Sequence, residues 1–97
     1  MRMFIKVTVP NEGGNAAIKD GSLAALVGRF MEEHRPEAAY FITENGERTA
    51  LFFMDLKDVS LIPALAEPFF LGVNARISYT PAMNPQDLRA GLEKLKL

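Results

Sequence analysis

In the first third of the chain, the spacing of hydrophobic residues changes from that of a β-strand to that of an α-helix. Residues 3–9, MFIKVTV, alternate between two sets of side chains, which is the period of a β-strand with two unlike faces. Pro10 ends this run because proline has no N–H to donate to a neighbouring strand. Residues 22–35 instead repeat at helical spacing, with apolar side chains three and four residues apart at Leu23, Leu26, Val27, Phe30 and Met31.

The ends of this first predicted helix carry recognisable signals. Asp20 or Ser22 can cap its start, where backbone N–H groups lack partners. His34 and Arg35 fall in its last turn, where cations suit the helix dipole. Pro36 follows and blocks continuation.

The middle of the chain predicts a β-hairpin. Residues 37–43 and 48–56 are rich in residues that favour strands, and Asn45-Gly46 lies between them, which is the strongest short-range signal for a tight hairpin turn. The run ALFFM, residues 50–54, is almost continuously apolar and predicts a central strand covered on both faces.

The last third predicts a helix, a strand and a second helix. Residues 58–70 indicate a short helix with Ser60 as its N-cap, and Pro68 marks its expected end. Residues 72–81 alternate again. Residues 84–97 then predict a C-terminal helix with Asn84 as the N-cap and Pro85 as the first helical residue.

This order of elements, β-α-β-β-α-β with a C-terminal helix, predicts an α+β fold. It is the ferredoxin-like arrangement, a single domain over residues 1–97 whose antiparallel four-stranded sheet has the usual strand order 4-1-3-2. Both main helices cover one face of such a sheet. We expect that face to hold Met3, Ile5, Val7, Ala50, Phe52, Met54, Ala75, Ile77 and Tyr79.

The second face of the predicted sheet is amphipathic. From the first, third and fourth strands we expect it to hold Phe4, Lys6, Thr8, Leu51, Phe53, Asp55, Arg76, Ser78 and Thr80. The second strand adds either Tyr40 and Ile42 or Phe41 and Thr43, and we favour the latter pair. An apolar patch of this size is seldom left in water. A second copy of the chain, the C-terminal helix folded across it, or a ligand is expected to cover it.

The stretch from Val9 to Gly21, VPNEGGNAAIKDG, contains paired glycines but neither of the glycine motifs that bind phosphates. Its glycines also precede the predicted helix by several residues, whereas phosphate binds at a helix N-terminus. We therefore interpret it as a connection. Its length is unusual for a link between a strand and a helix, so a lid over a pocket is the functional alternative.

The residues from Leu51 to Pro81 resemble the dimeric α+β barrel superfamily, which includes muconolactone isomerases and antibiotic-biosynthesis monooxygenases. The similar features are an apolar third strand ending in Asp55, the helix start DVSLIPAL, the turn EPFF and an alternating fourth strand. The resemblance implies a homodimer in which two ferredoxin-like sheets pack face to face. It also implies pockets between sheet and helices or inside the barrel. It transfers no catalytic residue, because the superfamily has no universal catalytic motif.

Composition narrows the possible partners and surroundings. The formal net charge of −1 shows no excess of basic residues of the kind that binds the phosphates of nucleic acids. An RNA-recognition domain would share the topology, and Phe4 and Phe53 are suggestively placed, but ERTALFFM lacks its basic-glycine-aromatic pattern. No run is long and apolar enough for a membrane span. The chain has no cysteine, and its first residues do not read as a signal peptide, so we expect a cytoplasmic protein.

Three residues are candidates for catalysis: His34, Asp55 and Arg76. Lys6 lies between Asp55 and Arg76 on the second face, and the group reads either as interfacial salt bridges or as a polar cluster that binds a carboxylate or enolate. His34 reads either as a helix-end residue or as an acid–base group at a pocket mouth. A single histidine with no cysteine predicts no metal site, and we expect no cofactor.

The sequence leaves the function open between two classes of protein. The first is a small homodimer that binds or transforms a small organic molecule, in an isomerase- or monooxygenase-like way. The second is a non-catalytic homodimeric interaction or structural module. The residues expected at the ligand pocket or dimer face are Phe4, Lys6, Phe41, Leu51, Phe53, Asp55 and Arg76.

Overall fold

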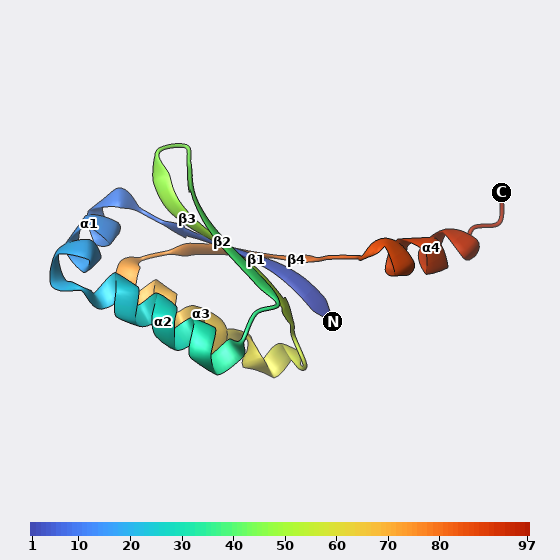
Figure 1. Ribbon diagram of the computed structural model, residues 1–97, viewed down its shortest axis with the longest axis horizontal. Coiled ribbons are helices and arrows are strands. Elements are labelled where there is room, and N and C mark those ends of the chain that lie inside the picture. Colours follow the sequence, from blue (N-terminus) through green and yellow to red (C-terminus); the bar gives the residue numbers. More distant parts are fainter.

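The computed structural model describes all 97 residues as an α+β fold with a C-terminal arm (Figure 1). Four strands form one sheet. The strands are β1 (Arg2–Val9), β2 (Ala38–Glu44), β3 (Glu47–Asp55) and β4 (Arg76–Pro81). The helices are α1 (Asn11–Asp20), α2 (Ser22–His34), α3 (Ile62–Val73) and α4 (Pro85–Glu93), with a 3₁₀ turn, η1 (Val59–Leu61), before α3.

The sheet has the strand order β2-β3-β1-β4, with every neighbouring pair antiparallel. This confirms the predicted ferredoxin-like topology. The Asn-Gly turn is also confirmed, since Asn45 and Gly46 both have positive φ, of 54° and 77°. Opposite residues such as Phe4 and Phe53, or Lys6 and Ser78, set the register and therefore fix which side chains share a face.

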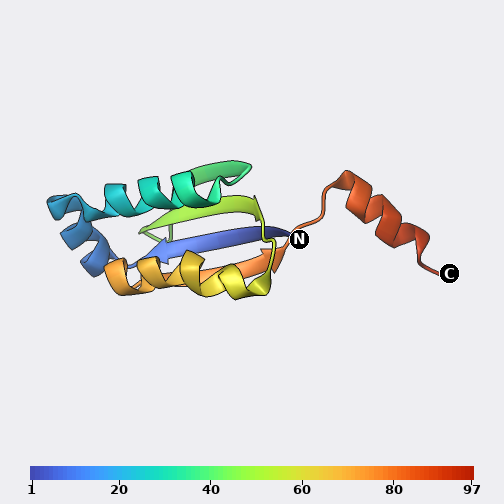
Figure 2. The same ribbon diagram turned by 90° about the horizontal axis from the view of Figure 1, so that it is seen from below.

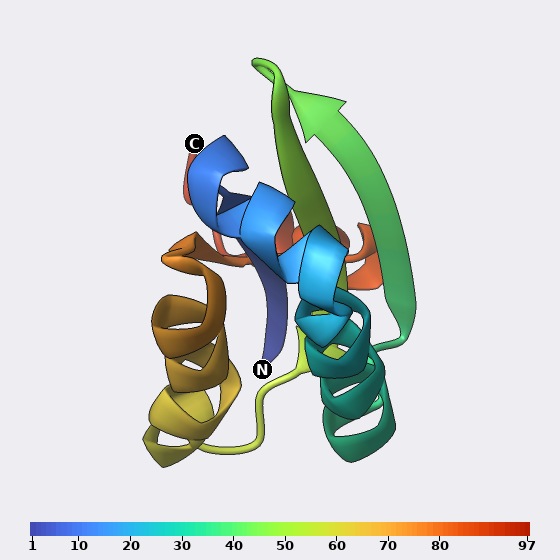
Figure 3. The ribbon, with the colours of Figure 1, turned by 90° about the vertical axis from the view of Figure 1, so that its left-hand side faces the viewer.

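The core lies between one face of the sheet and the helices α2 and α3, which lie side by side on it (Figure 3). The residues predicted for this face are those found in the core or packed against it. Phe52, Phe69, Ile5 and Val7 are the largest fully buried side chains. The ring of Phe30 on α2 packs against the rings of Phe52 on β3 and Phe69 on α3, with ring centroids 4.3 and 5.5 Å apart. These contacts join both helices to the sheet.

The stretch predicted as a loop-like connection, or as a lid, forms a helix, α1, between β1 and α2. Its glycines are not there for flexibility. A Cβ on Gly13 would lie 2.6 Å from the carbonyl oxygen of Val73, and one on Gly14 would lie 2.7 Å from Arg48 Nη1. The glycines let α1 approach α3 and β3 closely, while Ala17 is buried beneath it. Gly21, at φ 79°, ends α1 in a left-handed conformation.

The N-cap of α2 is Gly21, so the prediction that Asp20 or Ser22 caps this helix was wrong. The Asp20 carboxylate accepts a hydrogen bond from the Ser22 backbone N–H at 2.8 Å, whereas Ser22 is itself the first helical residue. His34 lies in the last turn, as predicted.

Helix α3 continues through Pro68, which the sequence had marked as its end. Proline removes one hydrogen bond from a helix interior and strains the preceding turn. Here Leu65 and Ala66 before the proline, and Phe69 and Val73 after it, are all buried in the core. We infer that this burial outweighs the cost of the proline. The cap also differs from the prediction, because Asp58 accepts from the Ser60 backbone N–H at the start of η1.

Helix α4 leaves the body of the molecule altogether (Figures 1 and 2). Its predicted N-terminus is confirmed, with Asn84 and Asp87 forming a reciprocal capping box and Pro85 in the first turn. Of the three alternatives for covering the second sheet face, the C-terminal helix is excluded in the single chain, because it extends beyond the end of β4 and none of its residues is buried. The molecule is consequently 55 Å long but only 28 and 18 Å across.

Candidate binding site

The sheet face away from the helices carries a small aromatic cluster. Phe4 and Phe53 face each other across β1 and β3, with ring centroids 4.9 Å apart and planes 20° apart. Because Tyr40 pairs with Leu51 and Ile42 with Thr49, these two residues of β2 share that face. We name this surface the open face; α2 and α3 both lie on the other side of the sheet (Figure 1).

Phe41 belongs to the opposite face, so the favoured placement of Phe41 and Thr43 was wrong. Phe41 pairs with Ala50 and meets the buried ring of Phe52 edge to face, with centroids 6.0 Å apart. A strand alternates with a period of two, so one incorrect register for β2 reverses every residue on it. Phe4, Lys6, Leu51, Phe53, Asp55 and Arg76 do share the open face.

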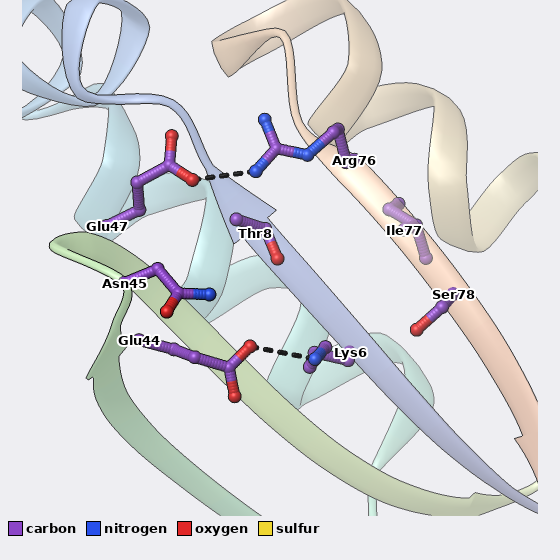
Figure 4. A pocket seen from close by; sticks show the side chains of 8 residues that line it. All are labelled: Lys6, Thr8, Glu44, Asn45, Glu47, Arg76, Ile77 and Ser78. Atoms are coloured by element: carbon purple, nitrogen blue, oxygen red, sulfur yellow. Dashed lines mark hydrogen bonds and ion pairs between the residues drawn. The ribbon is translucent and has the colours of Figure 1, made fainter.

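One end of the open face forms a polar cleft of about 300 Å³ (Figure 4). It is lined by Lys6, Thr8, Glu44, Asn45, Glu47, Arg76, Ile77 and Ser78. Lys6 Nζ lies 2.8 Å from a Glu44 carboxylate oxygen, and Arg76 Nη2 lies 2.7 Å from one of Glu47 (Figure 4). Both cations are therefore already neutralised, and the cleft presents no free charge to an anion.

Lys6 and Arg76 thus come together as predicted, but their carboxylate partners flank the hairpin turn instead of ending β3. Asp55 lies at the far end of the sheet, opposite Arg2. It binds the N-terminal amine at 2.8 Å and Lys57 Nζ at 3.4 Å. These hydrogen bonds, first to the amine and then to Lys57, lower the pKa of Asp55. The predicted group of Lys6, Asp55 and Arg76 is not a single cluster.

His34 lies on the other side of the sheet from Arg76. Its ring packs against Phe30 with centroids 5.0 Å apart, and only 15% of its side chain is exposed. It lines a narrow groove between α2 and α3 that also contains Pro68 and Phe69. The structure therefore does not bring the three catalytic candidates to one place.

A different, largely apolar pocket of about 370 Å³ lies between α2 and the inner face of the sheet. The pocket is lined by Val7, Val9, Leu23, Val27, Phe41, Ile42, Thr43, Arg48, Thr49, Ala50 and Phe69. Eight of these eleven residues are hydrophobic, and the only charged one is Arg48. This size and lining are typical of pockets that bind small organic molecules.

Arg48 occupies this pocket without a carboxylate partner. Its Nη1 donates to Asn15 Oδ1 on α1 at 3.1 Å and lies close over Gly14. The ion pairs of the molecule do not include Arg48. Asn11 on the same helix donates to the carbonyl of Gly46 at 3.1 Å, which ties α1 to the hairpin turn. Helix α1 therefore positions the guanidinium and holds the hairpin beside it.

Arg48 is not among the predicted site residues, although the sequence carries a signal for it. Arg48 precedes Ala50, Phe52 and Met54 at the spacing of a strand, so it occupies the same face as the core residues of β3. A charged residue at a core-facing position needs a partner or a purpose. Part of the setting of Arg48 comes from α1, which the sequence suggested was a loop.

The pocket provides one guanidinium, the hydroxyl of Thr43 on the same face as Arg48, and apolar walls. No group of three or more acidic or histidine side chains is arranged to hold a metal ion. None of the helices has the length and apolar character needed to traverse a membrane. No family model and no curated protein sequence matches this chain.

Proposed function

We propose that this protein binds a small organic anion with an apolar body in the pocket between α2 and the sheet. The observation that supports it is the guanidinium of Arg48, which stands at an apolar pocket without a carboxylate partner. A carboxylate matches the planar fork of donors on arginine and can accept two hydrogen bonds at once. The apolar part of the ligand would lie against Leu23, Val27 and Phe41.

Binding without chemical transformation fits this pocket best. Its lining contains no carboxylate and no histidine that could move a proton. His34 and Asp55, two of the catalytic candidates, lie outside it, and Arg76 lines the polar cleft on the open face. The proposed function is therefore that of a carrier or sensor of the ligand, and not that of an isomerase or monooxygenase.

A matched pair of ligands tests the proposal. We expect octanoate to bind and octanol, which has the same apolar chain without the charge, to bind more weakly by at least tenfold. Arg48→Met should remove the preference, since a hydrogen bond to a charged group contributes about 1.5–3 kcal/mol. Chemical-shift titration of the Val7, Val27 and Ala50 methyl groups measures both affinities.

The control variant is Arg29→Met, because Arg29 is an exposed arginine of α2 that forms no ion pair and does not line the pocket. It should leave octanoate affinity unchanged. Equal binding of octanoate and octanol, or equal binding by the Arg48→Met variant, would contradict the proposal.

A second candidate function is that of a homodimeric module of the dimeric α+β barrel type. We propose that two open faces pack together about a two-fold axis. Phe4, Leu51 and Phe53 support this, since they form a half-buried apolar group that no other part of the chain covers. In such a dimer the ion pairs of the polar cleft would help to set the register of the two sheets.

The oligomeric mass tests the dimer. Light scattering over a dilution series should give about twice the 10.7 kDa of one chain. Phe53→Arg should give monomer or aggregate, because it would bury an unpaired charge between the sheets. The control is Phe70→Arg, on the exposed side of α3, which should remain dimeric. A wild-type mass of one chain at all concentrations would refute the dimer and leave the ligand proposal standing.

A further inference from the structure

The polar groups of the pocket between α2 and the sheet lie together at one end, beside the hairpin turn. Thr43 on β2 and Arg48 on β3 face each other on either side of this turn. Residues opposite each other in an antiparallel pair have Cα atoms about 4.5–5.5 Å apart, and their side chains share one face of the sheet. Thr43 is exposed and Arg48 is half-buried, so this end is the mouth of the pocket.

The other end of the pocket is apolar. Val27 lies one helical turn beyond Leu23 on α2, and Val7 and Phe69, each 1% exposed, form the most buried wall. A polar group of a ligand placed there would lose its hydrogen bonds to water and gain none from these side chains. The ligand that fits therefore has an apolar tail and keeps its polar atoms together at the mouth.

The side chains at the mouth offer more hydrogen-bond donors than a simple carboxylate uses. Arg48 has several N–H groups, of which one at Nη1 donates to Asn15 Oδ1. A carboxylate can accept from a pair of the others. The hydroxyl of Thr43 forms no hydrogen bond with any other residue of the chain. It is free to donate to an oxygen on the ligand carbon next to the carboxylate.

We propose that the ligand of this pocket is a 2-hydroxy or 2-oxo carboxylic acid with an apolar tail. Its carboxylate pairs with Arg48, and the Thr43 hydroxyl donates to the oxygen on C2. This inference rests on the proposed binding of an organic anion and names the class of that anion. The corresponding 2-amino acid is excluded, because its ammonium group would lie beside the Arg48 guanidinium and the pocket lining contains no carboxylate to balance it.

A set of eight-carbon acids that differ in one group tests the class by calorimetric titration. We expect 2-hydroxyoctanoate, each enantiomer separately, or 2-oxooctanoate to bind about threefold to tenfold more tightly than octanoate, because one net hydrogen bond is gained. The isomer 8-hydroxyoctanoate carries its hydroxyl at the apolar end and should bind no more tightly than octanoate. The affinity of 2-aminooctanoate should be lower than that of octanoate by roughly tenfold. Tighter binding of the hydroxy or the oxo acid alone identifies which of the two the site takes.

Thr43→Val removes the hydroxyl and keeps the branched shape of the side chain. It should abolish the gain from the C2 oxygen and leave the affinity for octanoate unchanged, which a purely structural role of Thr43 would not produce. The control is Thr80→Val, because Thr80 is exposed on the open face; it should change neither affinity. If octanoate binds better than octanol but the C2 oxygen adds nothing, or if its gain survives Thr43→Val, this inference is overturned and the proposed function stands. If octanoate binds no better than octanol, both fail.

Discussion

At the scale of single residues, Gly13 and Gly14 decide how the first helix is placed. Glycine lowers helix propensity, which is why the sequence around these residues resembles a loop. Their missing side chains are nevertheless needed, because Gly13 faces the backbone of α3 and Gly14 faces the guanidinium of Arg48. The two glycines therefore make the helix difficult to predict from the sequence, and they also allow α1 to pack closely and to orient Arg48.

Two glycine-to-alanine substitutions, one in α1 and one in α2, test whether close packing requires the glycines of α1. Gly13→Ala should destabilise the protein by about 1–3 kcal/mol, because the new Cβ would force the Val73 carbonyl away. Gly28→Ala, in the open surface of α2, should stabilise it by about 0.5–1 kcal/mol, since nothing lies within 4 Å of that position. Urea unfolding measures both. A neutral or stabilising Gly13→Ala would show that α1 does not dock as described.

At the scale of elements, the start of α4 depends on one carboxylate. Asp87 accepts hydrogen bonds from the Asn84 backbone N–H at 3.0 Å and from Arg2 at 2.8 Å. These bonds, first that from Asn84 and then that from Arg2, lower the pKa of Asp87 below its usual value of 3.8. The element is therefore fastened to β1 and capped by the same ionised group.

The lowered pKa makes this fastening sensitive to acid. Its stabilising contribution is fully present above pH 3.8, the ordinary value, and is lost as the pH falls through the lowered pKa of the folded state. We expect the amide resonances of Asn84 and Asp87 to shift, and α4 to fray, in that acidic range before the sheet unfolds. Asp87→Asn should abolish this local transition. Glu93→Gln, at the other end of α4, should leave it unchanged. A pH profile unaffected by Asp87→Asn would contradict the assignment.

At the scale of the whole molecule, the two faces of the sheet differ in what covers them. The inner face carries the core and, where α2 leaves space beside β2, a pocket with Arg48. The open face carries Phe4, Leu51 and Phe53 without cover from the rest of the chain, and the proposed two-fold dimer would cover them. Because the pocket lies on the other side of the sheet from the proposed interface, we expect the Phe53→Arg monomer, where it stays folded, to retain octanoate binding.

The sequence by itself determined the four strands, the hairpin turn, the core-facing residues of β1, β3 and β4, and the capped start of α4, while the strand order followed from the fold class that these elements indicate. These features follow from local periods and turn residues, which act over a few positions and are legible without the fold. The face of β2, the helix through Gly13 and Gly14, the passage of α3 through Pro68 and the separation of Asp55 from Arg76 were decided by tertiary structure. In each case packing between distant segments outweighed a weak local preference. The same holds for the pocket residue Arg48. Its contacts with Asn15 and Gly14 form only when α1 packs against β3.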